Sequence, residues 1–246
     1  MQLSIVIPAY NEEKRLPQTL ERLFLLFRNN PNIGHEILIM DDGSSDGTVA
    51  HVQQLQKQHP ELKLKVPERN RGRGVVVREG MLAAHGDFVL ETDSDGSVAD
   101  EAIIRFLQFL QTNPQYDVAL GSRLIPDATV VVPQPFIRIL LGSVFMFLAR
   151  LLFGWEIHDY TVGFKMFRRD AAQDVARHLY ETGFIAEAEL PIVAKHRRWR
   201  MKELPVAWTD NKDSKVKPLR DTWRSLAGMA RMVWRGWRGT YTIRDK

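Results

Sequence analysis

Short apolar runs alternate along the chain with longer segments in which apolar residues are spaced three and four apart. Short apolar runs predict buried strands, and the longer spacing predicts amphipathic helices. The predicted strands are residues 4–7, 36–40, 63–66, 88–91 and 118–120. The predicted helices are residues 16–27, 48–59, 75–85 and 101–111. This alternation predicts an α/β fold with a mostly parallel sheet flanked by helices on both faces.

A long apolar segment follows in the second half of the chain. Residues 136–155 are strongly apolar, but Arg138 and Arg150 interrupt them and leave an uncharged stretch of only 139–149. Because a membrane span needs roughly 20 apolar residues, we expect a helix that lies in the membrane interface or in the protein core.

The C-terminal segment predicts a second amphipathic helix. One narrow sector of this helix carries its arginines, which are Arg220, Arg224, Arg231, Arg235 and Arg238. The other side carries apolar residues, among them Trp223, Trp234 and Trp237. A basic stripe beside a Trp-rich face predicts a helix that lies in the membrane interface. The alternative is a helix docked on its own domain with its arginines in solvent.

The length and charge of the chain limit what it binds. Its 246 residues are enough for one α/β domain, placed at 1–218, and a basic amphipathic tail at 219–246. The net charge is only +4, yet residues 196–246 hold 14 Lys and Arg against 5 Asp and Glu. A basic end on an acidic body predicts an anionic partner: membrane lipid, nucleic acid or a phosphorylated substrate. No nucleic-acid-binding motif is visible, so we expect no nucleic acid partner.

The cellular compartment is indicated by what the sequence lacks. Cysteine is absent, which excludes disulfides and thiolate metal sites and fits a reducing compartment. The chain opens on a predicted strand, with no basic segment followed by an apolar one, so we expect no signal peptide. Together with the basic tail, these features favour a cytoplasmic protein held peripherally at the cytoplasmic face of a membrane.

Polar motifs follow the predicted strands. Three of them stand directly after an apolar run: Pro8 to Glu12, Asp41-Asp42-Gly43 and Asp93-Ser94-Asp95. Open α/β sheets bind ligands at the carboxyl ends of their strands. We therefore expect the three motifs to meet at one edge of the sheet and to form a binding site there.

Asp93 and Asp95 are the candidate metal ligands. Two carboxylates two residues apart on a turn lie close together, and hard cations such as Mg²⁺ and Mn²⁺ bind carboxylates together with substrate phosphates. The alternative is a turn in which the aspartates only accept local backbone hydrogen bonds.

Two other loops have residues suited to a nucleotide. The carboxylates of Asp41 and Asp42 can accept hydrogen bonds from a ribose or a base, although Ser45 or Asp46 can also be a simple helix cap. In the glycine-rich loop 70–74, Arg73 can reach a phosphate. This loop matches neither the dinucleotide-binding fingerprint nor the Walker A motif, and a plain glycine-rich loop is the alternative.

Taken in order, these motifs resemble the family 2 glycosyltransferases, whose Rossmann-like fold is called GT-A. The resemblance covers roughly the first 125 residues and includes PAYNE, DDGSSDGT, RGRG, GDFVLETDSDG and Gly121-Ser122-Arg123. It implies that a nucleotide sugar is bound by Pro8, Ala9, Tyr10, Glu12, Asp41, Asp42, Arg73, Asp93 and Ser94. It also implies that Asp93 and Asp95 hold a divalent metal on the donor diphosphate.

The second half is similar to the dolichyl-phosphate glucose and mannose synthases, through DYTVGFKMF, AEAEL, ELPVAW and DSKV. The glucosyl branch is nearer because of Ala207-Trp208. The resemblance implies that Arg123, Arg138 and Lys215 contact the acceptor phosphate or the donor diphosphate. Three features depart from the pattern: Asp-Ser-Asp replaces Asp-Ala-Asp, Gly96-Ser97 offers no third metal ligand, and the irregular approach to Gly-Phe-Lys weakens any role for Asp159.

Glu187 and Glu189 lie in a further predicted helix. Residues two apart point to different faces of a helix, so we expect one carboxylate to be functional and the other solvated. The resemblance favours Glu189 as the inward, catalytic one, beside Asp95 and Arg123. The alternative for Glu189 is a buried carboxylate paired with an arginine.

The resemblance implies inverting transfer of a hexose from a nucleotide diphosphate sugar to a polyprenyl phosphate, with Mg²⁺ or Mn²⁺. UDP-glucose is favoured as the donor over GDP-mannose. One alternative is an enzyme of the same fold that uses a soluble sugar or protein hydroxyl as acceptor. Another is a catalytically inactive, membrane-associated scaffold, which the cluster of charged residues argues against because such a cluster is costly without a use.

Overall fold

The computed structural model describes residues 2–132, 136–210 and 218–242. The strands are β1 Leu3–Ala9, β2 His35–Asp41, β3 Leu62–Lys65, β4 Phe88–Thr92, β5 Val118–Ser122, β6 Thr129–Val132, β7 Phe164–Arg168, β8 Met201–Pro205 and β9 Ala207–Thr209. The helices are α1 Leu16–Arg28, α2 Thr48–Gln56, α3 Arg73–Ala83, α4 Glu101–Thr112, α5 Phe136–Phe153, α6 Arg169–Arg177, α7 Ala186–His196 and α8 Pro218–Trp237. The elements predicted in the first half are confirmed, with small shifts at their ends.

A seven-stranded sheet in the order β3-β2-β1-β4-β7-β5-β8 forms the centre of the molecule. Strands β3, β2, β1 and β4 are parallel to one another, and β8 is parallel to β5. Strand β7 lies between β4 and β5 and is antiparallel to both. The predicted mostly parallel α/β sheet is therefore confirmed, and β7 is the antiparallel strand that was not predicted. Strands β6 and β9 pair separately as a small second sheet.

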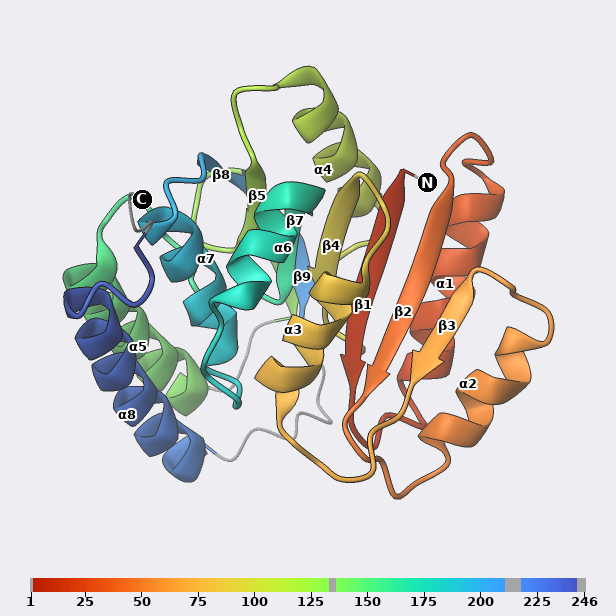
Figure 1. Ribbon diagram of the computed structural model, residues 1–246, viewed down its shortest axis with the longest axis horizontal. Coiled ribbons are helices and arrows are strands. Elements are labelled where there is room, and N and C mark those ends of the chain that lie inside the picture. The colour runs from red at the N-terminus through yellow and green to blue at the C-terminus, as the bar shows by residue number, and fades with distance from the viewer. Residues whose placement is uncertain (1, 133–135, 211–217, 243–246) are drawn as a thin grey trace.

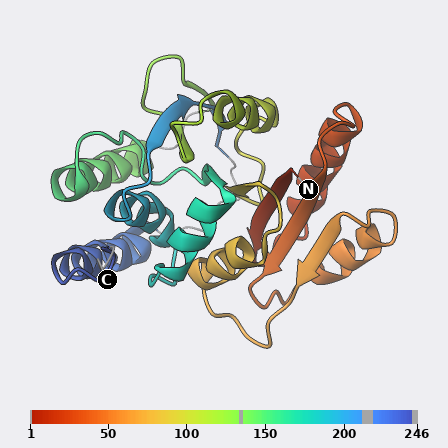
Figure 2. The same cartoon turned by 45° about the horizontal axis from the view of Figure 1, so that its top comes forward.

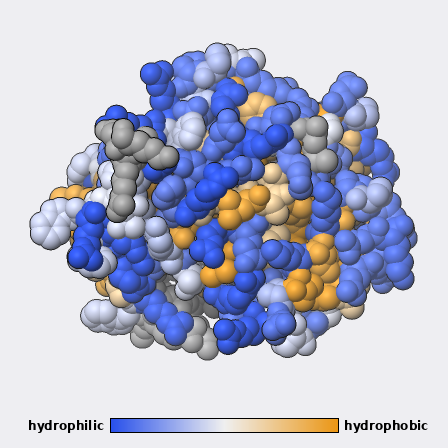
Figure 3. All heavy atoms as spheres, viewed as in Figure 1, coloured by the Kyte–Doolittle hydropathy of each residue, from blue (hydrophilic) through white to orange (hydrophobic). Residues whose placement is uncertain are grey.

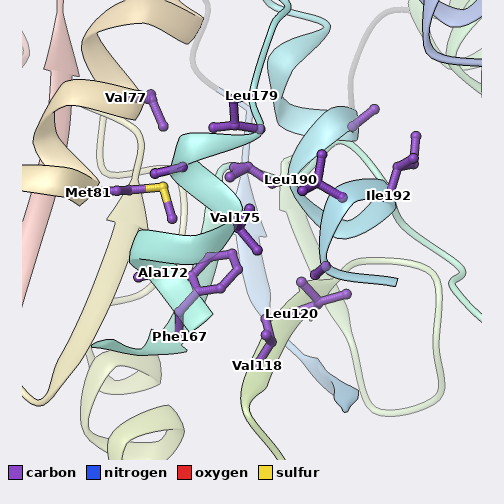
Figure 4. Close-up of a cluster of buried hydrophobic side chains, with 14 of the residues drawn as sticks. Val77, Met81, Val118, Leu120, Phe167, Ala172, Val175, Leu179, Leu190 and Ile192 are labelled. Atoms are coloured by element: carbon purple, nitrogen blue, oxygen red, sulfur yellow. The ribbon is translucent and has the colours of Figure 1, made fainter. Parts of the chain in front are cut away.

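The apolar core is divided between the two faces of this sheet. Side chains alternate along a strand, and in β1 Ile5 and Ile7 pack on one face while Val6 packs on the other. Helices α1 and α4 cover the first face, and α3, α6 and α7 cover the second (Figures 1 and 2). Figure 4 shows the second cluster, in which side chains of α3, α6 and α7 meet those of β5 and β7.

Helices α5 and α8 lie side by side at one end of the molecule (Figures 1 and 2). Met146 and Ala149 of α5 and Met229 and Met232 of α8 are buried and belong to the same core cluster as α3, α6 and α7. The predicted tail therefore shares its core with the rest of the chain. Among the described residues, no helix is both long and apolar enough to cross a membrane.

Candidate active site

The carboxyl ends of the parallel strands meet at one edge of the sheet, which is the lower edge in Figure 1. The loop after β1, the turn after β2, loop 70–74 before α3 and the turn after β4 all lie at this edge. The expectation that the three polar motifs come together is therefore confirmed.

Asp41 and Asp42 hold these loops together. The Asp41 carboxylate accepts hydrogen bonds from the backbone N–H groups two and three residues further on, at 2.8 and 2.9 Å. The Asp42 carboxylate accepts the backbone N–H groups of Arg71 and Gly72, at 2.7 and 3.0 Å. Both carboxylates are buried. The two aspartates thus fix the turn after β2 against loop 70–74.

The segment after β1 is fastened to the same turn. Pro8 and Ala9 are buried in β1, whereas Tyr10 is exposed at the edge. The backbone N–H of Asn11 donates to Ser44 Oγ at 2.8 Å. Asn11 adopts a positive φ of 54°, a conformation that asparagine tolerates better than most residues. This kink lets the chain leave β1 and turn directly into α1.

Glu12 connects this segment to the turn after β4. Its buried carboxylate accepts two hydrogen bonds from the Arg15 guanidinium, at 2.5 and 2.7 Å. Another nitrogen of Arg15 lies 3.6 Å from Asp95 Oδ2. Glu12 therefore positions an arginine next to the second aspartate of the Asp-Ser-Asp turn.

The Asp93-Ser94-Asp95 turn combines a local and an outward role. Asp95 Oδ1 accepts hydrogen bonds from the N–H and the hydroxyl of Ser97, at 3.0 and 2.5 Å. This is the local turn geometry that we gave as the alternative to metal binding. Ser94 is buried, and its carbonyl accepts the Thr19 hydroxyl. The Asp93 side chain stays 38% exposed and points to the edge, where Arg73 meets it.

Arg73 is the centre of a charged cluster. It is the first residue of α3, and its guanidinium lies 2.7 Å from Glu91, 2.7 Å from Asp93 and 2.6 Å from Glu187. Burial lowers the pKa of Arg73, but the charges of Glu187, Asp93 and Glu91 outweigh it and raise the pKa. One arginine is therefore held charged among three carboxylates that come from different elements.

A buried lysine completes this cluster. The Lys165 ammonium of β7 is fully buried and donates to Glu187 at 2.7 Å and to the Val162 carbonyl. Burial opposes the ionised form of Glu187, but Lys165 and Arg73 lower its pKa to about 2. Burial and the charge of Glu187 raise the pKa of Glu91, whose Oε2 has no hydrogen-bond partner among the described residues. Glu187 is thus the ionised anchor of Arg73, and Glu91 favours the protonated form.

Arg123 belongs to a second cluster, just past β5. Its guanidinium makes a bidentate pair with the fully buried Asp159, at 2.7 and 3.0 Å, and donates to Thr161 Oγ1 at 3.0 Å. It also lies over the Trp208 ring of β9, 5.2 Å from the centroid. The backbone N–H of Asp93 donates to the Gly163 carbonyl at 3.2 Å, two residues past Thr161, so the two clusters are neighbours. Asp159, for which the sequence favoured little role, is the main partner of Arg123.

Glu189 lies outside these clusters. Its fully buried carboxylate accepts the N–H groups of Tyr180 and Glu181, at 2.9 and 2.8 Å, and the Tyr241 hydroxyl at 2.6 Å. The structure therefore brings Glu187, and not Glu189, to Arg73 and Asp93. The expectation that one of the two glutamates is solvated was wrong, because α7 is covered on both sides.

Two predicted contact residues cannot be positioned. Arg138 lies in α5, but its side chain is outside the described part of the structure, and Lys215 falls in the undescribed stretch 211–217. Their roles in binding a phosphate stay predictions.

Asp93 and Asp95 form a donor set that fits a divalent cation. Partial burial and the nearby charge of Asp95 raise the pKa of Asp93, against the opposing charge of Arg73. A cation bound between the two carboxylates would relieve this repulsion. The described residues contain no metal-binding group of three or more His, Asp or Glu. Mg²⁺ commonly uses one or two carboxylates together with substrate phosphates, so a two-carboxylate set is sufficient.

Sequence reasoning missed three members of this site: Glu91, Lys165 and Asp159. Glu91 and Lys165 are charged residues within apolar strands, and Lys and Glu are almost never fully buried without a partner. A charge in an otherwise buried strand was therefore the signal that could have found Glu91 and Lys165.

The fold and the site together define an α/β protein with a cluster of charged side chains at the carboxyl edge of its parallel strands. Residues 4–176 match the glycosyl transferase family 2. The match covers more than half of the chain, so the chain belongs to this family and is a glycosyltransferase.

Two curated relatives are similar over almost the whole chain. The chain is 32% identical over 244 residues to the dolichyl-phosphate beta-glucosyltransferase of Drosophila melanogaster, covering 95% of this chain and 74% of the fly protein. It is also 32% identical over 227 residues to the human dolichyl-phosphate beta-glucosyltransferase, covering 88% of this chain and 70% of the human protein.

A solved structure shares the fold. Glucosyl-3-phosphoglycerate synthase from Mycobacterium tuberculosis, in complex with Mn²⁺, UDP-glucose and phosphoglyceric acid, superposes with a TM-score of 0.62 at 16% identity. The alignment covers 100% of this chain and 81% of that structure. The predicted GT-A fold is thereby confirmed.

Proposed function

We propose that this chain transfers a glucosyl residue from UDP-glucose to a polyprenyl phosphate, with inversion at the anomeric carbon, on the cytoplasmic surface of a membrane. The observation that carries the proposal is the juxtaposition of Asp93, Arg73 and Arg123 at the sheet edge. It occurs in a chain whose curated relatives are named dolichyl-phosphate beta-glucosyltransferases.

The donor would lie across the edge formed by the loops after β1, β2 and β4. Asp93 and Asp95 would hold a Mg²⁺ or Mn²⁺ ion, which supplies positive charge that stabilises the leaving diphosphate. Arg73, fixed by Glu91 and Glu187, presents a rigid guanidinium beside Asp93. A guanidinium held in this way binds phosphate oxygens without first losing conformational freedom.

The acceptor phosphate would bind at Arg123. Asp159 and Thr161 fix the orientation of this guanidinium, and the Trp208 ring covers one side of it. An oxygen of the acceptor phosphate forms the new bond to the anomeric carbon as the bond to the diphosphate oxygen breaks, and UDP leaves. A phosphate monoester is already ionised at neutral pH, so this step needs no strong general base. This agrees with the low pKa of Glu187, which is a poor base.

The surface of α5 and α8 supports a membrane location for the acceptor. Large apolar side chains of both helices are exposed: Ile139, Leu140, Val144, Phe147, Leu151, Leu152, Trp223, Val233, Trp234 and Trp237. Figure 3 shows by contrast a face over the sheet helices that is mostly hydrophilic, with scattered apolar patches. Exposed apolar side chains, including tryptophans, beside basic residues suit a membrane interface.

The test is transfer of label from a panel of radiolabelled nucleotide sugars to a short polyprenyl phosphate, extracted into organic solvent, with Mg²⁺ or Mn²⁺ present. We expect transfer from UDP-glucose. Asp95→Ala should lower it by about 100-fold or more, because a charge that stabilises the leaving group is lost. Asp87→Ala is the matched control, since Asp87 pairs with Arg169 on the surface away from the site and should leave transfer unchanged.

The other outcomes separate the alternatives. Transfer to water-soluble acceptors only would keep the family and overturn the lipid acceptor. Transfer from GDP-mannose alone would overturn the proposal that UDP-glucose is the donor. Absence of both transfer and metal-dependent UDP binding would indicate the inactive scaffold.

A further inference from the structure

The loop between α6 and α7 touches the donor site on one side and helix α8 on the other. This connecting loop consists of residues 178–185 and leads directly into Glu187, the anchor of Arg73. Neither its sequence nor the family motifs single it out. It contacts loop 70–74 through its backbone and α8 through salt bridges.

On the donor side, the connecting loop presses against loop 70–74 backbone to backbone. The N–H of Gly74 donates to the Thr182 carbonyl at 2.9 Å. A Cβ atom at Gly72, where φ is +97°, would lie 2.3 Å from that same carbonyl oxygen. A Cβ atom at Gly74 would lie 2.0 Å from the Glu181 carbonyl oxygen. Only glycine allows this approach, so the position of loop 70–74, and with it Arg73, depends on the connecting loop.

On the other side, two arginines of α8 form ion pairs with the Glu181 carboxylate. The nearly buried Glu181 carboxylate accepts hydrogen bonds from Arg231 at 2.5 and 3.0 Å and from Arg235 at 2.6 Å. Arg235 also lies over the Tyr180 ring, 5.2 Å from its centroid. Two arginines of the predicted basic stripe are thus turned toward the protein, while the tryptophans of α8 remain exposed.

Helix α8 also packs closely against the connecting loop, and we call this contact the junction. A Cβ atom at Gly228 of α8 would lie 2.9 Å from the Ile185 side chain and 3.3 Å from a Glu181 carboxylate oxygen. Glu189 adds a second fastening, because it binds both the backbone of the connecting loop and the Tyr241 hydroxyl beyond the end of α8. The junction is held by charge-assisted hydrogen bonds in a buried setting, which are the stronger kind.

We propose that Glu181 is a positioning residue through which α8 sets loop 70–74 and therefore the affinity of the site for the nucleotide diphosphate. The inference rests on the proposed function, since it assumes that Arg73 meets the donor diphosphate. It assigns α8 a second role: the helix whose outer face carries the exposed tryptophans also holds the donor loop from its inner face.

The experiment measures binding of UDP in the presence of Mn²⁺ by calorimetry, in the whole 246-residue chain without lipid. Glu181→Gln keeps the shape of the side chain and removes its charge, and Arg231→Gln breaks the same pair from α8. Each should weaken UDP binding by about 2- to 30-fold, the range typical of coupled positions. The double variant should bind UDP no more weakly than Glu181→Gln alone, because Glu181→Gln already weakens the contacts with both Arg231 and Arg235.

The matched control variants replace a glutamate and an arginine at other positions on the surface. Glu156→Gln breaks a surface pair with Lys195, and Arg177→Gln removes an exposed arginine of α6. Both should bind UDP like the wild type. The KM for polyprenyl phosphate should be unchanged in Glu181→Gln, whereas general loosening of the fold would alter both substrates.

Three results would count against the proposal. Equal UDP affinity in wild type and both variants would overturn it, as would a lower thermal midpoint without a change in UDP affinity. Additive losses in the double variant would show that the two residues act separately. If Glu181→Gln does not fold, Arg231→Gln carries the test, since the Arg231 side chain as a whole is half exposed. A wild type that binds no UDP would instead overturn the proposed function.

Discussion

The carboxyl edge of the sheet, where the donor is proposed to bind and which we call the donor edge, differs from the outer face of α5 and α8 in the side chains that it leaves exposed. At the donor edge, charged groups are buried and paired: Lys165 and Glu187 are almost inaccessible, and Arg73 touches three carboxylates. On α5 and α8, large apolar groups are left in solvent, with Trp237 88% and Trp223 74% exposed.

The contrast indicates what each region is built to meet. A buried, paired set of charges is costly to assemble and gains its value when it arrives already oriented at a charged substrate. Exposed tryptophans leave an unfavourable contact with water that a less polar surface would remove. The charged groups at the edge of the sheet are therefore paired mostly with one another, whereas the exposed apolar groups of α5 and α8 would gain from the proposed contact with a membrane.

The largest expected effect comes from breaking the buried cluster. Glu187→Ala leaves Lys165 buried without its anionic partner, so we expect the free energy of unfolding to fall by about 3–5 kcal/mol, measured by urea denaturation. Glu156→Ala breaks a surface pair with Lys195 and should cost about 1 kcal/mol or less. Equal losses in the two variants would mean that water reaches the cluster and that the contrast with the surface is false.

The second largest effect is expected on the exposed apolar face of α5 and α8. Trp234→Ala combined with Trp237→Ala removes two of the large exposed side chains of α8, and partition onto vesicles containing anionic phospholipid should weaken on the order of 10- to 100-fold. Leu25→Ala on α1, an apolar position as exposed as Trp234, should not change partition. Sedimentation with the vesicles gives both values. Unchanged partition in the double variant would remove α8 from the membrane proposal.

The sequence was sufficient for the first half of the fold because several of its elements have one clear period. The runs in β1, β2 and β4 are continuous apolar segments, and α1 and α4 carry a single apolar stripe. Each glycine- or aspartate-containing turn between them marks where a strand ends. Because the polar motifs directly follow the predicted parallel strands, the sequence predicts that their loops lie at one edge of the sheet.

The second half was harder for physical reasons. Strand β7 carries Lys165 in the middle of an apolar run, and edge strand β8 includes Lys202 and Glu203, so neither has a clean strand pattern. Helix α7 is buried on all sides, so the rule that separates Glu187 from Glu189 by helix face did not identify a solvated residue. Pairing partners come from distant elements, and spacing along the chain cannot reveal them.

The smallest effect concerns Arg123, which joins the buried chemistry of the edge to the lipid side of the reaction. Burial opposes the ionised form of Asp159, but Arg123 outweighs it and lowers the pKa, so the pair is ionised at neutral pH and is lost only as the pH falls through that lowered value. Asp159→Asn keeps the size of the side chain but removes the charge that orients Arg123. We expect the KM for polyprenyl phosphate to rise about 10-fold while UDP affinity stays constant, because hydrogen bonds to charged groups contribute about 1.5–3 kcal/mol. Steady-state kinetics with each substrate varied in turn would separate the two. A rise in the donor constant alone would place Arg123 at the diphosphate and leave the acceptor phosphate to other residues.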